Sequence, residues 1–366
     1  MNPEDLEAVA SLTADDEFSK KDLQQEADLS EAQTYTVSDG TDLSITKAGV
    51  YVLSGTARNV TVYVDAADED KVWLVLDGLT ITNEDHPCIY VKSADKVFVT
   101  TASGSDNTLT VTGDFATDDG KKMNGVIFSK DDLCLNGLGT LTISSSDNGI
   151  VSKDDLKVTG GTLAVTAENT GLKANDSIRI ADGNITVRAK NDGLHAEDDD
   201  DDTTGYIYIA GGTLDITAED DGIHATTILQ VDAGTISVTA LEGLEATFVR
   251  LNGGTITVNA TDDGINAAQK STAYTPAIIF AGADVTITMG RGDTDAVDAN
   301  GSILVSGGTI TITAQSAFDY DTAAWHTGGT IIVNGQEVTE IGNQFGPGGM
   351  GGRGSQGGWG GQGGRP

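Results

Sequence analysis

The sequence contains few of the residues that build a compact core of large side chains or cross-link a small one. Only 5% of its 366 residues are aromatic, and it has 5 prolines and 2 cysteines, Cys88 and Cys134. These cysteines fall at different positions of the repeat described below, so we expect no disulfide between them. The sequence also lacks an apolar run of about 18 residues or more, which excludes a membrane-spanning helix.

Basic residues are scarce as well. The chain has 21 Lys and Arg against 56 Asp and Glu, which gives a formal net charge of -35. Such a charge repels nucleic acids and anionic membrane surfaces, so neither is an expected partner. Bound cations would relieve the self-repulsion of the folded chain. The alternative interpretation is that the acidic residues bind no cation and only keep the protein soluble.

Glycine, in contrast, is abundant, with 47 residues, and much of it belongs to an internal repeat. One repeated unit is a polar or acidic residue, a glycine and an aliphatic residue. The glycines of this unit are separated by 22, 22, 29, 21 and 21 residues, at Gly149, Gly171, Gly193, Gly222, Gly243 and Gly264. The long step contains an inserted acidic loop at 197–205. A second insertion, around 269–276, precedes the next unit at Asp295-Ala296-Val297.

A second repeated unit, Gly-Gly-Thr, opens short segments such as TLAVTA after Gly161 and TLDITA after Gly212. Apolar and polar residues alternate in these segments, which indicates strands with one face inward. The glycines supply positive φ at the corners between strands. A coil of about 21 residues with two or three short strands predicts an all-β, right-handed parallel β-helix, a solenoid over residues 34–345. The patterns of leucine-rich repeats and of calcium-binding nonapeptide rolls are absent.

The two ends of the chain differ from the repeat. Residues 1–33 form an acidic N-terminal leader, either solvated or a short helix lying on the body. Residues 346–366 are a flexible, glycine-rich tail. Met1 to Asp5 lack the charged-then-apolar layout of a secretion signal, so either the protein is cytoplasmic or a leader has been removed.

Equivalent residues of successive coils in a parallel β-helix stack about 4.8 Å apart. Two carboxylates at that distance repel by about 3.5 kcal/mol at an effective dielectric constant of 20, so a stack of them favours a bound cation. Calcium suits these positions because it takes oxygen ligands in flexible geometry. The predicted ligands are Asp147, Asp154, Asp155, Asp192, Asp220, Asp221, Glu242, Glu245, Asp262, Asp263, Asp295 and Asp298. The alternative is that these residues have only a structural role, because Asp and Asn in turns form hydrogen bonds with nearby backbone groups.

Nitrogen ligands are few in these columns, which disfavours transition metals. The column two places after the turn glycine contains, in order, Lys173, His195, His224, Glu245, Asn266, Asp298 and Asp319. We assign His195, His224 and Asn266 to ligand binding.

Several segments resemble a known family. They are GVYVLSG (49–55), KVWLVLDGLTI (71–81), SKDDL at 129–133 and 152–156, DDGIHA (220–225) and DDGINAA (262–268). They are similar to a secreted bacterial carbohydrate-binding domain family, formerly a domain of unknown function, typified by a clostridial cellulose- and pectin-binding parallel β-helix protein. The resemblance implies a fold like that of polysaccharide lyases, bound calcium and plant-wall polysaccharide as ligand. It also implies an extracellular or cell-surface location, often through a lipid anchor, with the leader absent from this chain.

The first functional hypothesis is therefore a non-catalytic polysaccharide-binding module. Calcium would bridge protein carboxylates to the uronates of an acidic polymer such as polygalacturonate. For an uncharged polymer such as cellulose, Trp325 near the last coil, with Tyr320 and Phe318, is the candidate aromatic platform.

Two alternatives stay open. A calcium-dependent polysaccharide lyase needs a basic residue to take the proton, and Lys173 in the turn column is the candidate. Carboxylates around it raise its pKa, which opposes that role. A cell-surface structural adhesin is the third hypothesis.

Overall fold

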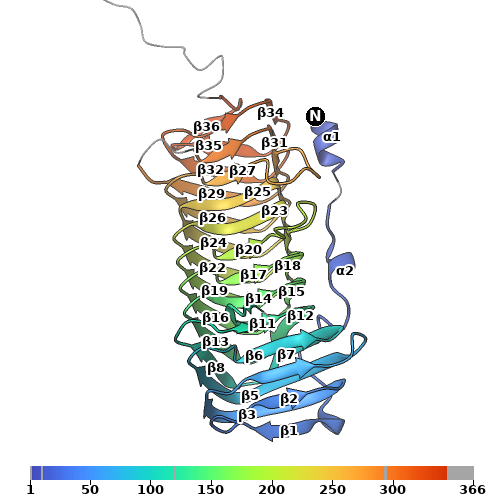
Figure 1. Ribbon diagram of the computed structural model, residues 1–366. Coiled ribbons are helices and arrows are strands. Elements are labelled where there is room, and N and C mark those ends of the chain that lie inside the picture. Colours follow the sequence, from blue (N-terminus) through green and yellow to red (C-terminus); the bar gives the residue numbers. More distant parts are fainter. Residues whose placement is uncertain (1, 10, 119, 292–294, 344–366) are drawn as a thin grey trace, which may run out of the picture.

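Equivalent strands of successive coils pair in parallel and form three ladders that run the length of an elongated solenoid (Figure 1). The computed structural model describes residues 2–9, 11–118, 120–291 and 295–343. The predicted all-β parallel β-helix is confirmed by this pairing. The glycine-rich tail assigned to 346–366 lies outside the described residues.

Ladder 1 carries the Asp-Gly repeat, and some of its strands continue into ladder 2. Its strands are β2 (Leu43–Ile45), β4 (Val62–Asp65), β6 (Ile89–Ser93), β11 (Gly125–Ser129), β14 (Asn148–Ser152), β17 (Leu172–Ala174), β20 (Leu194–Ala196), the first parts of β23 (Asp221–Val231) and β25 (Glu242–Leu251), β27 (Ile265–Ala267), β30 (Val297–Ala299) and β33 (Asp319–Tyr320).

Ladder 2 follows in each coil. Its strands are β1 (Gln33–Thr36), the first parts of β3 (Gly49–Arg58) and β5 (Lys71–Asn83), β7 (Lys96–Thr101), β12 (Leu133–Gly137), β15 (Asp155–Val158), β18 (Ser177–Ile180), β21 (Tyr206–Ile209), the second parts of β23 and β25, β28 (Ala277–Phe280), β31 (Ser302–Val305) and β34 (Ala323–His326).

Ladder 3 contains the strands that begin near the Gly-Gly-Thr corners. They are the second parts of β3 and β5, β8 (Asp106–Val111), β13 (Thr140–Ser145), β16 (Thr162–Ala167), β19 (Asn184–Ala189), β22 (Thr213–Ala218), β24 (Thr235–Ala240), β26 (Thr255–Ala260), β29 (Asp284–Met289), β32 (Thr309–Thr313) and β35 (Thr330–Val333), with β36 (Gln336–Val338) antiparallel at the end. A separate hairpin pairs β9 (Thr117–Asp118) with β10 (Lys121–Lys122).

Inward-facing residues of the three ladders fill the interior with stacked aliphatic side chains. In β16, Leu163 and Val165 are buried while Thr162 and Thr166 are exposed, as the period-two pattern predicts. These residues belong to one hydrophobic cluster that extends from Ile45 to Ile331. The core is therefore continuous along the axis, and each coil buries its apolar face against its neighbours.

Glycine is required at two places in the coil for different reasons. Gly161 and Gly212, at the corners before ladder 3, have φ values of 80° and 90°, which confirms the positive φ predicted there. Gly222 of the Asp-Gly repeat is instead limited by space. A Cβ on it would lie 2.1 Å from Val238 Cγ1 and 2.6 Å from the carbonyl oxygen of Gly243 in the next coil.

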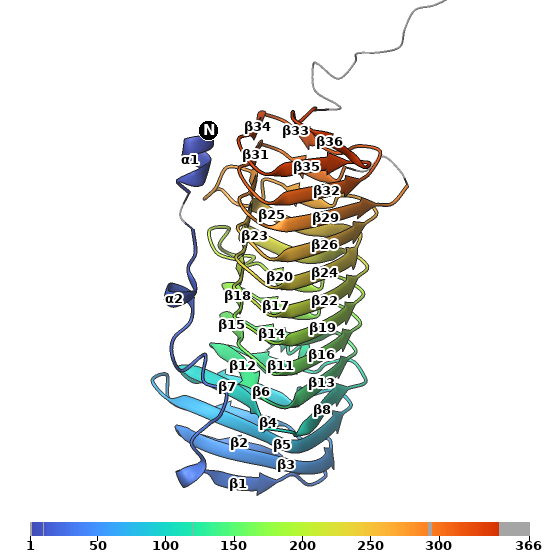
Figure 2. The same ribbon diagram turned by 180° about the vertical axis from the view of Figure 1, so that it is seen from behind.

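The N-terminal segment lies along the outer face of ladder 2 as a strap (Figures 1 and 2). It contains α1 (Pro3–Glu7), α2 (Ala14–Glu17) and a 3₁₀ turn, η1 (Leu29–Glu31). Arg250 Nη2 donates hydrogen bonds to the carbonyl oxygens of Leu6 and Val9, both at 3.0 Å, and the Gln25 side-chain amide donates to that of Thr159 (2.9 Å). The acidic leader is therefore an ordered covering segment and not solvated chain.

Asp22 is the central electrostatic contact of this strap. Its side chain is fully buried, 3.2 Å from Lys96 Nζ and 3.3 Å from Lys157 Nζ. Burial raises the pKa of Asp22, but the backbone N–H of Ser19 and the two ammonium groups lower it by more, so the net shift is downward. The carboxylate thus stays ionised between two lysines of ladder 2.

Both cysteines are free and buried. Cys88 packs inside the solenoid, and Cys134 lies on the outer face of ladder 2, where its sulfur is 3.8 Å from the carbonyl oxygen of Asp22. Burial raises the pKa of each thiol to about 12, so neither is a reactive thiolate.

Within the described part of the chain, no helix has the length and apolar character needed to cross a membrane.

Replacing Asp22 tests whether the strap stabilises the solenoid. We expect Asp22→Asn to lower the free energy of unfolding by about 3–5 kcal/mol, because it leaves buried ammonium groups without their counter-charge. Urea-induced unfolding measures this loss, and limited proteolysis reports release of the strap. Asp15→Asn, an exposed position of the same strap, is the matched control. Equal stability of the two variants would show that the buried ion pairs are not a major stabilising contact.

Candidate functional site

One outward-facing column of ladder 1 collects most of the predicted ligand-binding residues. The parallel register aligns Lys173 with His195, His195 with His224, and His224 with Glu245, and it continues through Asn266, Asp298 and Asp319. We call this set the outer column. Its order is the one predicted from the sequence, so the stacking on which the site depends is confirmed.

The outer column continues toward the N-terminal end with residues that sequence analysis did not identify. Val151 aligns with Lys173, Phe128 with Val151, and Tyr90 and Tyr63 follow. The column therefore changes from aromatic and apolar residues, through lysine and histidine, to carboxylates and amides. The first coils repeat less regularly in sequence, and this hid their alignment with the later ones.

A second column precedes the turn glycines. Gly193 N–H donates to the carbonyl oxygen of Asp221 (2.9 Å), Gly243 N–H to that of Asp263 (2.9 Å), and Gly264 N–H to that of Asp295 (3.0 Å). The residues before the glycines thus stack in the predicted order Asp192, Asp221, Glu242, Asp263 and Asp295. Because the two columns are neighbours, their carboxylates converge on one edge of the solenoid.

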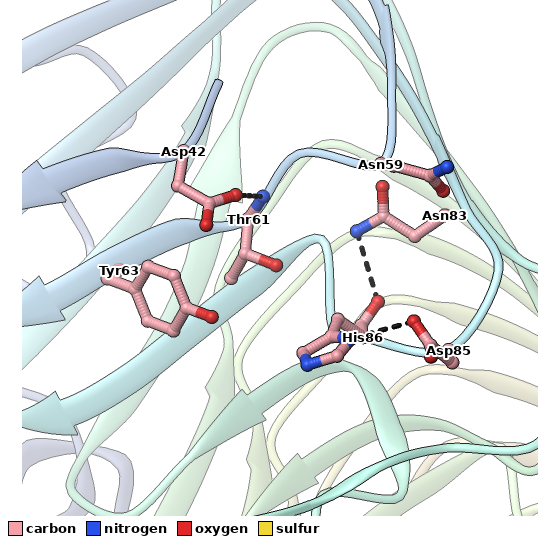
Figure 3. A pocket seen from close by; sticks show the side chains of 7 residues that line it. All are labelled: Asp42, Asn59, Thr61, Tyr63, Asn83, Asp85 and His86. Atoms are coloured by element: carbon pink, nitrogen blue, oxygen red, sulfur yellow. Dashed lines mark hydrogen bonds and ion pairs between the residues drawn. The ribbon is translucent and has the colours of Figure 1, made fainter. Parts of the chain in front are cut away.

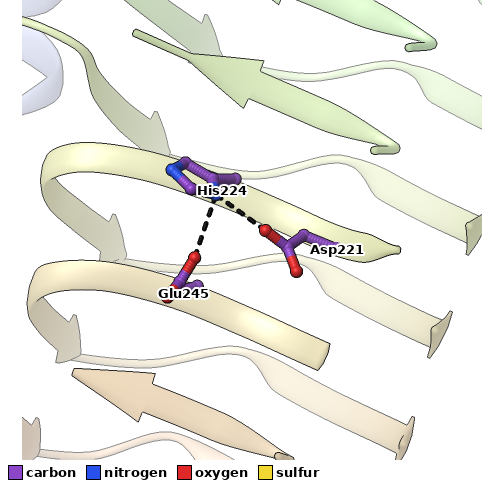
Figure 4. A group of neighbouring side chains, drawn as sticks. All are labelled: Asp221, His224 and Glu245. Carbon is purple, nitrogen blue, oxygen red and sulfur yellow. Dashed lines mark hydrogen bonds and ion pairs between the residues drawn. The ribbon is translucent and has the colours of Figure 1, made fainter. Parts of the chain in front are cut away.

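Two histidines occupy the centre of this edge. His224 Nδ1 lies 2.7 Å from Asp221 Oδ2 and 3.0 Å from Glu245 Oε2 (Figure 4). His195 contacts Asp192 Oδ2 through Nδ1 at 2.5 Å and Glu197 Oε2 through Nε2 at 2.9 Å. The two imidazole rings stack with centroids 4.6 Å apart.

These histidines act as internal cations. Burial lowers the pKa of His224, but the hydrogen bonds to Asp221 and Glu245 raise it by more, to about 10. The hydrogen bond from His195 is the largest cause that lowers the pKa of Glu197, to about 2. Asp221, His224 and Glu245 have the spacing of a metal site, and protonated His224 offsets part of the charge of the two carboxylates.

The next coils carry carboxyl groups that lack this compensation. Burial is the main cause that raises the pKa of Glu242 to about 7, of Asp263 to about 7 and of Asp298 to about 6. Neighbouring carboxylates add to each shift: Glu245 beside Glu242, Asp298 beside Asp263, and Asp319 beside Asp298. Among the described residues none of these three carboxyl groups forms an ion pair, so burial and the neighbouring carboxylates dominate their pKa values.

Asn266 connects the two parts of the edge. It is 9% exposed, and its Nδ2 donates to Glu242 Oε2 (3.1 Å) and Glu245 Oε1 (3.4 Å). Its Oδ1 is buried without a hydrogen-bond partner among the described residues. A buried amide oxygen left unpaired beside carboxyl groups is a ligand of the type that calcium takes. This oxygen is therefore a candidate ligand for a hard cation.

Lys270 is a further residue of this edge that sequence analysis missed. Its Nζ lies 3.1 Å from Glu245 Oε1, and although burial lowers the pKa of Lys270, Glu245 raises it by more. Lys270 comes from the insertion at 269–276, whose path over the coil the repeat pattern does not specify.

Other predicted ligands lie in different surroundings. Asp147 pairs with Lys122 at 2.6 Å, and Asp155 pairs with Arg179 at 2.7 Å. Asp154 lies with Asp155 and Asp132 at the corner between ladders 1 and 2, where burial and Asp176 raise its pKa to about 6.

The remaining predicted residues differ from Asn266 because they are exposed or lie in another ladder. Asp220 and Asp262 are exposed. Trp325 lies in ladder 2 and packs, half-buried, against the cluster of Leu6 and Leu304, with Phe318 buried in the core. The three aromatic residues proposed as a platform are thus packing residues in this structure.

Two cavities lie on the face of ladder 1. The smaller, about 140 Å³, is lined by Asp42, Asn59, Thr61, Tyr63, Asn83, Asp85 and His86 (Figure 3). It is below the range of about 300–1,000 Å³ that small-molecule sites occupy. The larger, about 640 Å³, lies beside Tyr90 and Phe128 of the outer column.

Comparison with known proteins finds one similar solved structure and one similar sequence. The solved structure of a polysaccharide lyase-like protein from C. thermocellum superimposes with a TM-score of 0.51 and 30% sequence identity, covering 78% of this chain and 98% of that one. A carbohydrate-binding domain-containing protein from Acetivibrio thermocellus is 42% identical over 123 residues. That match covers 33% of this chain and 43% of the relative, so it spans less than half of the relative's length.

A family model described as carbohydrate-binding domain-containing protein matches residues 39–272, which include the outer column from Tyr63 to Asn266. The stacked register, the polar edge and this match lead to one assignment: the chain belongs to the family of carbohydrate-binding domain-containing proteins.

Proposed function

We propose that the protein is a non-catalytic, calcium-dependent module that binds plant-cell-wall polysaccharide, either polygalacturonate or cellulose, outside the cell or at its surface. The observation that carries this proposal is the unpaired, buried Asn266 Oδ1 beside carboxyl groups whose pKa values are raised. Calcium would supply the missing positive charge, held by Asn266, Glu242, Asp263 and Asp298.

The polysaccharide part of the proposal is supported by the family and by the shape of the site. The edge is long and regular, and its polar groups recur at the coil spacing of about 4.8 Å. An acidic polymer would be repelled by a protein of charge -35 unless cations link the two. Calcium held at the edge provides that link, because it also takes uronate oxygens as ligands.

Two features favour binding over catalysis. A lyase needs a lysine that becomes neutral near the operating pH, but the pKa of Lys270 is raised by Glu245. Lys173, the candidate base, lies in the outer column beside His195, and its charge helps to lower the pKa of Glu197. It is therefore part of an ionic group with His195 and Glu197.

Retention on immobilised polymer tests the proposed function. We expect the protein to be retained by polygalacturonate or cellulose in calcium, and retention to fall about tenfold or more in EDTA, with no release of unsaturated uronides. The double variant Glu242→Gln, Asp263→Asn should lose this calcium response because it removes two ligands. Asp284→Asn, an exposed position of ladder 3, is the matched control.

Other outcomes would identify other functions. A rise in ultraviolet absorbance from unsaturated uronides would establish a lyase, with Lys173→Ala as the next variant. Retention on neither polymer would favour a structural adhesin.

The raised pKa values also predict how stability depends on pH. Glu242 and Asp263 titrate near 4.5 and 3.8 when unperturbed and near 7 in the folded protein. Between these values the native state holds more protons than the unfolded state, so stability falls as the pH rises. In EDTA we therefore expect a lower Tm at about pH 8 than at about pH 5.

Calcium should reverse this trend, because its ligands must be deprotonated and its binding stabilises the native state. Asp263→Asn should flatten the pH dependence in EDTA and reduce the calcium effect. Thermal unfolding followed by circular dichroism measures both. A Tm in EDTA that rises from about pH 5 to about pH 8 would contradict the electrostatic account.

A further inference from the structure

Ladder 2 holds the N-terminal strap largely through the main chain of the strap. Gln230 accepts a hydrogen bond from the N–H of Leu12 (2.9 Å) and donates one to the carbonyl oxygen of the same residue (2.8 Å). Lys157 Nζ donates to the carbonyl oxygen of Glu17 (3.0 Å), and Arg250, aligned with Gln230, donates to the first residues of the strap. Main-chain groups are the same in every residue, so these donors recognise the path of the chain more than its sequence.

Three buried side chains fix the position of the strap. Leu6 packs in the cluster that contains Phe248. The ring centroid of Phe18 lies 6.1 Å from that of Tyr208, and Asp22 forms the buried ion pairs described above. Among the described strap residues 2–9 and 11–32, these three alone are buried. A few buried anchors on an otherwise accessible segment are typical of a peptide bound to a protein surface.

The strap and the surface beneath it have complementary charges. Residues 1–33 contain ten acidic residues and two basic ones. Arg179 Nε lies 3.2 Å from Glu17 Oε2, and the two lysines that hold Asp22 belong to the same face of ladder 2. In a chain of net charge -35, this face therefore gathers cations that select an acidic segment.

The strap is separate from the strand pairing of the solenoid. Its described residues contain no ladder strand, since the first one, β1, begins at Gln33. We call residues 26–32, which join the strap to β1, the connector. Most of the connector is exposed, namely Glu26, Asp28, Leu29, Ser30 and Glu31. The family model begins at residue 39, so the strap also lies outside the matched part of the chain. A strap from another molecule would therefore find the same contacts on ladder 2.

The connector joins the solenoid at an end with open strand edges (Figure 2). Within the described ranges β1 pairs with β3 alone and β2 with β4 alone, so each has a second edge without a strand. Tyr35, Val37 and Leu43 of this first coil are only half-buried against the core. At the opposite end β36 pairs with β35, and Val338 and Ile341 pack over the core. Open strand edges favour association with another chain.

We propose that two copies of the chain meet at these open ends and exchange straps, so that each strap docks on ladder 2 of the other copy. In the structure the strap lies back along its own solenoid, with α1 at the end opposite to β1 (Figures 1 and 2). In the exchanged dimer it continues onto the partner instead, and the contacts of Leu6, Phe18 and Asp22 form between copies. Reciprocal exchange closes a two-fold dimer in which both surfaces are filled.

The length of the connector and the protein concentration decide between the two forms. Residues 26–32 span at most about 25 Å when extended, so exchange requires the two open ends to be close together. At low concentration the strap binds its own solenoid, because the connector holds it there at an effective concentration of order millimolar. At high concentration the contacts between the open ends favour the dimer.

Isotope-mixed cross-linking of the unaltered chain tests the exchange. Burial, Lys96 and Lys21 lower the pKa of Lys71, which places Lys21 of the strap near ladder 2. Unlabelled and isotopically heavy protein are concentrated together in EDTA, warmed to just below the Tm and treated with an amine-reactive cross-linker. EDTA excludes calcium bridges between acidic copies. We expect hybrid pairs of Lys21 and Lys71 to approach about half of all such pairs, and to disappear when the proteins are diluted before warming.

Complementary variants give a second measurement. The strap variant Phe18→Ser, Asp22→Asn keeps an intact ladder 2, and the variant Lys96→Gln, Lys157→Gln keeps an intact strap. With different affinity tags, these two variants should co-purify at least about tenfold more than two strap variants do. Circular dichroism checks that each variant is folded. Adding Asp15→Asn, at an exposed strap position, to the variant with the intact strap is the matched control and should leave capture unchanged.

Hybrid pairs of Lys21 and Lys71 together with capture of the strap variant would support strap exchange. Hybrid pairs no more frequent than those of Lys21 with the exposed Lys190 would reflect random collision and overturn the proposal. Failure of the complementary variants to co-purify would also overturn it, because a strap without its own docking surface would then not bind in trans. Equal capture between two strap variants would show that copies associate without the strap, which contradicts exchange.

Discussion

Parallel hydrogen bonding between equivalent strands holds each side chain over its counterpart in the next coil, at about 4.8 Å. Every repeated residue type therefore becomes a row of like groups. Aliphatic rows such as that of Leu163 and Val165 gain from this arrangement because they pack. Rows of like charge do not, and each one must be compensated by a partner. The chemistry of the outer surface follows from how each charged row is compensated.

The outer column shows three ways of compensation along one edge. Over Tyr63 and Tyr90, ring faces offset part of the charge of the neighbouring lysines. At His195 and His224, two stacked imidazole rings each contact two carboxylates and offset part of their charge. Around Asn266, Lys270 pairs with Glu245, but within the described part of the chain Glu242, Asp263 and Asp298 form no ion pair. A repeat that appears uniform in sequence thus contains regions with different ligand preferences.

The sequence predicted the column from Lys173 to Asp319 correctly because the turn glycines fixed the register. It did not predict which acids are already neutralised, because Glu197, Lys270 and Arg179 approach from insertions or neighbouring ladders, and such contacts depend on the coil geometry. The cavity beside Phe128 was missed for the same reason. Trp325 was predicted as an aromatic platform, but it is half-buried in the cluster that contains the strap residue Leu6, a contact that the repeat pattern does not indicate.

The strap has a consequence for how the chain folds. Solenoids usually behave as one-dimensional arrays, in which coils form and fray with only their neighbours. Here Leu6 is hydrogen-bonded to Arg250, and Gln25 to Thr159, across long separations in sequence. The strap residues therefore reach their final contacts only after the coils of Thr159 and Arg250 exist. This high contact order should slow the last folding step and make the coils unfold together.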